Sequence, residues 1–134
     1  PLAFSARCFT ARHYELNKDD CQFKCLEHPE GLLLKTREGQ DFLTINGIQT
    51  MSAHCYDLLD QIPGILALGI DLVRISPQKE HLGTIIAAFD RARHGESFAP
   101  DRSGWSASGL VNGYWFGEPG IVQHQHHAIE HAGA

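Results

Sequence analysis

Three of the four cysteines lie in one short stretch near the start of the chain, at Cys8, Cys21 and Cys25. Their spacing is C-x12-C-x3-C, and on a helix Cys21 and Cys25 would be one turn apart, so their sulfurs can converge on one point. The segment that follows Cys8 is long enough to return to that point. Three converging thiolates favour a soft metal ion or an iron-sulfur cluster, so we predict a metal centre here.

The spacing alone leaves the identity of the metal open. Zinc needs a fourth ligand, and His28, three residues after Cys25, would complete a Cys3His set. An iron-sulfur cluster normally takes four thiolates. The remaining thiol, Cys55, falls in an apolar segment, where we expect it to pack as a core side chain. Free cysteines often pack in this way, but the polar residues around Cys21 and Cys25 argue against it for those two.

The elements that must position these cysteines are short. Residues 2–9 are apolar or small, and we expect a strand that delivers Cys8 to the top of a sheet. Residues 10–30 are polar and predict a loop-rich site region. Residues 31–46 contain two β-rich runs separated by the turn-type run 37–40, which predicts a β-hairpin. A hairpin beside the cysteines would shield the site from water.

Beyond the hairpin the pattern predicts alternating helices and strands. Residues 53–62 have apolar side chains at helical spacing, with Ser52 as N-cap and Pro63-Gly64 as the end. Residues 65–76 are apolar and β-branched, which predicts a buried strand in their second half. Residues 78–94 predict an amphipathic helix that ends before a glycine. A strand followed by a helix indicates βα units, so the predicted fold class is α/β with a parallel sheet.

The last part of the chain is rich in Gly, Ser and Pro, and within it only residues 109–116 look packed. We expect residues 117–134 to form a flexible tail. Histidines in this tail would suggest a metal site, but we interpret them as solvated. They are His124, His126, His127 and His131.

The composition is that of one soluble globular domain. The chain has 134 residues, of which 43% are hydrophobic and 20% charged; a domain of this size typically buries roughly 70% of its unfolded surface. No apolar run approaches the ~18 residues of a membrane span. A net charge of -5 gives no whole-chain attraction to nucleic acid or anionic lipid. The start lacks a secretory signal pattern, so we expect reduced thiols and a cytoplasmic protein.

A longer pattern surrounds the cysteines. Its segments are SARCFTARHYELNKDDCQFKCLEHPEGL, NGIQTMS at 46–52, VRISPQ at 73–78 and NGYW at 112–115. In this order, over about residues 4–116, the chain resembles the carboxy-terminal half of UbiV-like proteins of the collagenase-like peptidase family. The resemblance implies that Cys8, Cys21 and Cys25 bind a [4Fe-4S] cluster. In the family the fourth cysteine comes from the amino-terminal half, so we expect the fourth ligand to lie outside this chain.

The resemblance also implies a function and a partner. UbiV-like proteins pair with UbiU-like proteins and are required for oxygen-independent hydroxylation in ubiquinone biosynthesis, with prephenate as oxygen donor. We therefore expect a UbiU-like partner in a heterodimer, and prephenate or a quinone precursor as a possible small-molecule ligand. The family fold resembles a (β/α) barrel, so residues 1–116 would form a partial barrel with a cluster-binding loop at 8–30 and a hairpin insertion. Because a barrel takes ~250 residues, we expect a fragment or a chain that another chain completes.

Two further functions were weighed from the residues. The first is a collagenase-like peptidase, with Ser52 and His54, or Cys25 and His28, as nucleophile and base. The second is a non-enzymatic assembly module that zinc or a cluster stabilises. Arg74, in the predicted strand, is either a structural ion partner or a contact for an anionic ligand. Tyr114 and Trp115 are expected to be core or interface aromatics.

Overall fold

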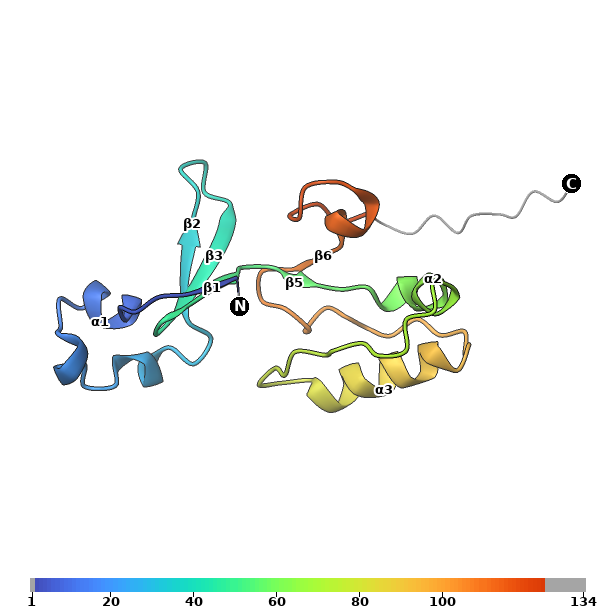
Figure 1. Ribbon diagram of the computed structural model, residues 1–134, viewed down its shortest axis with the longest axis horizontal. Coiled ribbons are helices and arrows are strands. Elements are labelled where there is room, and N and C mark those ends of the chain that lie inside the picture. Colours follow the sequence, from blue (N-terminus) through green and yellow to red (C-terminus); the bar gives the residue numbers. More distant parts are fainter. Residues whose placement is uncertain (1, 125–134) are drawn as a thin grey trace, which may run out of the picture. The chain divides into compact units, whose positions relative to one another are not determined.

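The computed structural model describes residues 2–124, and the chain divides into two compact units, Pro1–His54 and Cys55–Ala134 (Figure 1). Both units contain helices and strands, which confirms the mixed composition of the predicted fold. The described strands form one antiparallel sheet and one small parallel sheet, and within residues 2–124 they close no barrel. None of the helices in this range is long and apolar enough to cross a membrane.

The first unit is built on a four-stranded antiparallel sheet with the order β1-β4-β3-β2. Its strands are β1 (Ala3–Phe4), β2 (Leu32–Lys35), β3 (Asp41–Asn46) and β4 (Gln49–Ser52). The predicted hairpin over residues 31–46 is confirmed, because β2 and β3 pair antiparallel and are joined by a short turn. Figure 1 shows β2 and β3 side by side in this hairpin.

Glycine conformations close both hairpins of this sheet. In the β2–β3 turn the Thr36 amide donates to the Gln40 carbonyl at 2.8 Å, and Gly39 has a φ of +87°. In the β3–β4 turn Gly47 has a φ of +59°. Glycine adopts positive φ without the steric cost that a side chain brings, so the sequence specifies both turns locally.

A short helix, α1 (Phe9–His13), docks on the β3–β4 turn. The Phe9 amide donates to the Gly47 carbonyl at 2.7 Å, and the Gly47 amide donates to the Thr10 hydroxyl at 3.0 Å. The expected strand over residues 2–9 is therefore wrong beyond Phe4. The chain leaves the sheet because the turn at Gly47 binds the start of a helix instead of another strand.

The first unit has very little hydrophobic core. Among the side chains described in residues 2–54, those of Thr10 and Ala11 are the buried ones. Large apolar residues such as Phe23, Leu26 and Phe42 are exposed. A unit of this size gains only a small margin of stability from apolar burial even when its core is complete. Apolar burial within the described part of this unit therefore contributes little to its stability.

The second unit carries the hydrophobic core. Leu59, Ile85, Ala88 and Trp105 form its buried centre. A short parallel pair, β5 with β6, lies beside three helical elements and a final turn. The elements are β5 (Cys55–Tyr56), η3 (Leu59–Gln61), α2 (Ile62–Ala67), α3 (Leu82–Arg93), β6 (Leu110–Val111) and η4 (Gly113–Phe116).

The strand predicted in the second half of residues 65–76 is wrong, since that part of the chain has no regular structure, and α2 occupies the start of the range. Pro63 lies in the first turn of α2, where its fixed φ favours helix initiation. The helix ends in a Schellman motif, with the Gly69 amide donating to the Leu66 carbonyl and the Ile70 amide to the Ile65 carbonyl. Residues 70–78 have no regular structure. The apolar composition suggested a strand after Gly69, but this segment joins neither of the two sheets.

The helix predicted over residues 53–62 is also wrong. Ser52 is the last residue of β4 and does not cap a helix, and Cys55–Tyr56 form β5. In place of helical bonds, the Cys55 amide donates to Gly109 and the Asp57 amide donates to Val111, both across to the β6 region. Pairing with a distant segment has overridden the local helical spacing, which is a common reason for such errors.

The amphipathic helix predicted over residues 78–94 is confirmed as α3. Ile85 and Ala88 on its inner face are buried in the core. Gly95 follows with a φ of +75°, and its amide donates to the Ala92 carbonyl at 3.0 Å. The helix therefore ends at the glycine that the sequence indicated.

Candidate functional site

The first predicted ligand, Cys8, is the N-cap of α1. Its sulfur accepts a hydrogen bond from the Ala11 amide at 3.4 Å, and its side chain is half-buried. A sulfur that accepts a backbone N–H at the start of a turn is held in a fixed direction. The direction of the Cys8 side chain is therefore fixed by a helical turn and not by the strand that we predicted.

The other two predicted ligands flank an unusual backbone. Cys21 follows the single turn η1 (Lys18–Asp20), and Cys25 lies within η2 (Lys24–Glu27). Between them Gln22 and Phe23 have φ angles of +53° and +50°. The expectation that Cys21 and Cys25 share one helical turn is wrong, since two left-handed residues separate them. Such conformations cost of order 1–2 kcal/mol each in non-glycine residues and cluster at functional sites.

This backbone has the form that binds anions in other proteins. Cys21 is right-handed, with φ -80° and ψ -7°, and the next residue is left-handed. Successive amides in a right-handed to left-handed sequence point toward one concavity, a nest, which recurs at phosphate and iron-sulfur sites. A backbone of this form at Cys21 and Gln22 would suit an anionic group.

A contact between two aromatic rings joins α1 to η2. The Tyr14 hydroxyl and His28 Nε2 are 2.5 Å apart, and both side chains are half-buried. Tyr14 is the C-cap of α1, and His28 is the C-cap of η2. Tyr14 was not among the predicted site residues. Its position between Cys8 and Cys21 was the one feature of the sequence that could have indicated a role at the site.

The three thiols are of the type that binds an iron-sulfur cluster, but their sulfur atoms do not converge on one point in this structure. Cys8, Cys21 and Cys25 are free thiols, half-buried, and all lie in the first unit. Across residues 2–124, no three or more Cys, His, Asp or Glu side chains lie close enough together to hold a metal ion. Three thiols supply three of the four ligands that a [4Fe-4S] cluster normally takes.

The residues proposed for peptidase chemistry lie in different settings. His28 hydrogen-bonds Tyr14, so its Nε2 does not serve Cys25 as a base in this structure. Ser52 is an exposed strand residue, and His54 Nδ1 is buried without a hydrogen-bond partner among the described residues. Neither pair shows the hydrogen bond between nucleophile and base that such catalysis uses.

The remaining candidates are in the second unit. Cys55 is half-buried in β5, where its sulfur accepts from Gln78 Nε2 at 3.6 Å. Arg74 is exposed in the irregular segment and not in a strand.

The predicted aromatic and histidine candidates lie near the end of the described chain. Tyr114 is 74% exposed, so it is not a core residue, while Trp115 is half-buried. His124 packs on Phe116, and the further histidines of the predicted tail, His126, His127 and His131, lie outside the described residues.

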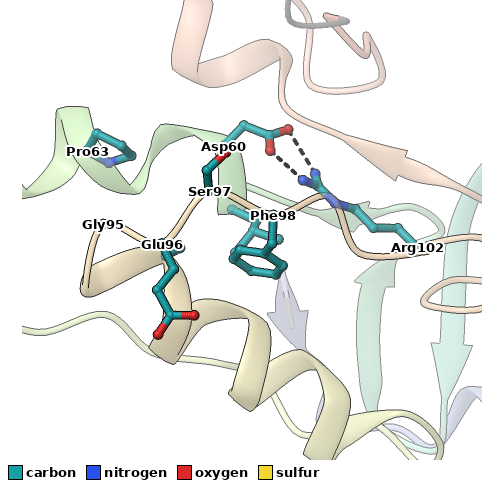
Figure 2. Close-up of a pocket in the computed structure, with 9 residues that line it drawn as sticks. Asp60, Pro63, Gly95, Glu96, Ser97, Phe98 and Arg102 are labelled. Atoms are coloured by element: carbon teal, nitrogen blue, oxygen red, sulfur yellow. Dashed lines mark hydrogen bonds and ion pairs between the residues drawn. The ribbon is translucent and has the colours of Figure 1, made fainter.

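A cavity of about 290 Å³ opens in the second unit between α2 and the segment after α3 (Figure 2). Phe98 and Leu59 form its apolar wall, and Asp60, Glu96 and Arg102 supply its charges. An exposed arginine here would suit a dicarboxylate such as prephenate. Whether Arg102 can do so depends on what already holds its guanidinium.

Two carboxylates hold Arg102. Its Nη1 donates to Asp57 and to Asp60, each at 2.9 Å, and its Nη2 also donates to Asp60. The hydrogen bonds to Asp60, reinforced by the charge of Asp57, raise the pKa of Arg102 above its ordinary value. Two negative charges on one positive charge leave this group net negative, so the cavity disfavours an anionic ligand. We assign this cluster a structural role.

Replacement of Arg102 with Met should destabilise the second unit by about 1–3 kcal/mol, because Asp57 is left buried without its cation. The Asp57 side chain is only 9% exposed. Both tryptophans, Trp105 and Trp115, lie in this unit, so denaturant unfolding followed by their fluorescence reports on it directly. Arg93→Met, which removes an exposed pair with Asp90, is the matched control and should leave the midpoint unchanged. Equal midpoints for both variants would contradict the structural role.

No protein-family model matches the chain, and no solved structure matches it at a significant level. The resemblance to the collagenase-like peptidase family therefore rests on the four sequence segments described above.

Proposed function

We propose that this chain is the cysteine-bearing part of a UbiV-like iron-sulfur component. In this proposal Cys8, Cys21 and Cys25 bind a [4Fe-4S] cluster, and the fourth ligand comes from outside the chain. The protein would act with a UbiU-like partner in oxygen-independent hydroxylation in ubiquinone biosynthesis, with prephenate or a quinone precursor as small-molecule ligand. Bound, such a cluster would supply single-electron transfer, and the iron without a thiolate from this chain could bind a substrate if the outside ligand is absent.

The observation that carries the proposal is the pairing of three free thiols with a nearly coreless unit. The first unit buries only Thr10 and Ala11 among its described side chains, yet it contains all three predicted ligands. In small domains with too little core, metal binding supplies folding free energy directly. A cluster in this unit would therefore stabilise the fold as well as serve the chemistry.

The backbone around the cysteines supports an anionic group. Cys8 Sγ accepts the Ala11 amide, and the right-handed to left-handed step at Cys21 and Gln22 points amides at one concavity. Hydrogen bonds from amides to sulfur stabilise a thiolate-bound cluster and tune its reduction potential. Gathering the three thiols needs a rearrangement of the short turns η1 and η2, which hold few buried contacts.

Exposed apolar residues support the proposal of a protein partner and of a larger barrel-like fold. In the second unit Leu68 is 70% exposed and Leu72 89% exposed, and Ile70 and Val73 nearby are also exposed. Exposed apolar patches of this kind mark interaction surfaces in proteins. In a completed barrel this irregular segment would become a strand, as its composition suggested.

The same exposed residues favour the second candidate, an assembly module without catalytic activity. The two candidates differ in what cluster loss does. For an assembly module, removing the metal abolishes association with a UbiU-like partner, and no hydroxylation step depends on the cluster's redox state. For a hydroxylase component, hydroxylation depends on the redox state of the cluster. A variant that still associates with its partner, but whose cluster cannot be reduced, would therefore be inactive.

Anaerobic reconstitution with iron and sulfide tests the leading proposal. We expect iron and inorganic sulfide to bind in equal amounts, with the broad visible absorption of a cluster. Amide hydrogen exchange in residues 1–54 should become slower, because the metal stabilises the first unit. Binding of one zinc ion with no uptake of iron would refute the cluster assignment and favour the zinc-stabilised module.

A further inference from the structure

One hydrogen bond links the two elements that carry Cys8 and Cys25. Cys8 begins α1 and Tyr14 ends it, while Cys25 lies in η2 and His28 ends that turn. The Tyr14 hydroxyl and His28 Nε2 meet at 2.5 Å across this gap. Because both elements are single short turns, a fixed contact at one end of each restricts the position of the cysteine at the other.

The contact extends beyond the hydrogen bond. The rings of Tyr14 and His28 stack with centroids 5.8 Å apart and planes 24° from parallel. Lys24 Nζ lies 5.6 Å from the centre of the Tyr14 ring and is held by Glu27 at 2.7 Å. His13 contacts the other side of Tyr14 edge-on, at 5.1 Å. Stacking, a cation and a hydrogen bond therefore act together at one point, in a unit that has almost no core.

We propose that Tyr14 and His28 are positioning residues for the metal centre. Their hydrogen bond holds α1 against η2 and limits the range of separations that Cys8 and Cys25 can adopt, and neither residue is a ligand. The inference rests on the proposed function, since the centre that they position is the predicted cluster. Because the contact restricts this range, gathering the two thiols at a cluster costs less conformational entropy than it would in an untethered loop.

The cluster-bound protein gives the first test. Tyr14→Phe removes only the hydroxyl, and we expect the cluster to be lost to a chelator about 10-fold faster, the usual scale for outer-sphere partners of metal ligands. His28→Ala should behave alike, and the double variant should be no worse than either single variant, because both remove one interaction. His28→Gln keeps a polar group facing Tyr14 and should restore part of the retention. Tyr56→Phe, in the second unit, is the matched control.

The same variants distinguish positioning from ligation. Pulsed electron paramagnetic resonance of the reduced cluster detects a directly bound nitrogen. We expect the wild-type spectrum to show no coupling to a His28 nitrogen. A nitrogen coupling that is present in the wild type and absent in His28→Gln would make His28 a ligand and overturn the proposal. Additive losses in the double variant would also overturn it, because then the two residues act separately.

A metal-free measurement keeps this inference separate from the proposed function. In a Cys21→Ser, Cys55→Ser background, a trivalent arsenical bonds Cys8 and Cys25 together, and its affinity reports their separation. We expect Tyr14→Phe to weaken this binding by about 10-fold. A wild-type chain that takes up no cluster, together with the expected loss of arsenical affinity, would reject the cluster and retain the positioning role. Unchanged arsenical affinity would reject the positioning role itself.

Discussion

Cys21→Ala is expected to abolish retention of the proposed cluster, because it reduces the predicted thiolate ligands of this chain from three to two. Cys21 is also the residue at which the backbone turns into the left-handed conformation of Gln22 and Phe23. The change removes a predicted ligand at the point where the backbone has the right-handed to left-handed form that suits an anionic group. Iron and sulfide analysis after anaerobic reconstitution and desalting measures the outcome, with the wild-type chain treated in parallel.

The matched control for this variant is Cys55→Ala. Cys55 belongs to the second unit, where its sulfur accepts from Gln78. We expect this variant to retain iron and sulfide at the wild-type ratio. If Cys55→Ala loses the cluster and Cys21→Ala keeps it, the assignment of ligands is wrong. The contrast tests the choice of cysteines, because the two variants remove the same chemical group.

Gly113→Ala is expected to destabilise the second unit by about 1–3 kcal/mol, the typical cost of overpacking a filled site. A Cβ at Gly113 would lie 2.0 Å from the carbonyl oxygen of Pro119 and 3.2 Å from Val122 Cβ. The backbone has little freedom to move away, since the Gly113 amide donates to Val122 and its carbonyl accepts from Glu118, each at 2.9 Å. Tryptophan fluorescence during denaturant unfolding measures the change, because Trp115 lies in the same loop.

Gly83→Ala is the control for Gly113→Ala. A Cβ at Gly83, in the first turn of α3, meets no atom within 4 Å. Alanine has the higher helix propensity, so this variant should be neutral or raise stability by up to about 1 kcal/mol. A Gly113→Ala midpoint as high as that of Gly83→Ala would show that the loop tolerates a side chain. The close approach of Gly113 to Pro119 would then have no energetic consequence.

Local sequence patterns predicted those elements that are started and ended by residues nearby in the sequence. The hairpin of β2 and β3 needed only a turn run with Gly39 between two β-rich runs, and α3 needed only apolar spacing and Gly95. Pro63 was interpreted as the end of a preceding helix, whereas it lies in the first turn of α2, and the apolar residues after Gly69 were interpreted as a strand that does not form. Proline is favoured in the first turn of a helix, so its position alone does not show that a helix ends there.

Pairing between distant segments could not be predicted in the same way. β5 forms because Cys55 and Tyr56 pair with Leu110 and Val111. Arg102 finds Asp57 across 45 positions of sequence. No local property of the chain specifies either contact, because each depends on the packing of the whole second unit.

For the candidate site, the sequence by itself determined which donor atoms are available, namely three thiols near one another in a polar stretch, and thiols are ligands that soft metals favour. Only the tertiary structure decided how they are held. It placed Cys8 at the start of α1, turned the backbone left-handed between Cys21 and Cys25, and joined Tyr14 to His28. The physical reason is that residue type fixes which donor atoms are available. The directions of those atoms depend on backbone angles and cross-loop hydrogen bonds, which form only when the unit folds.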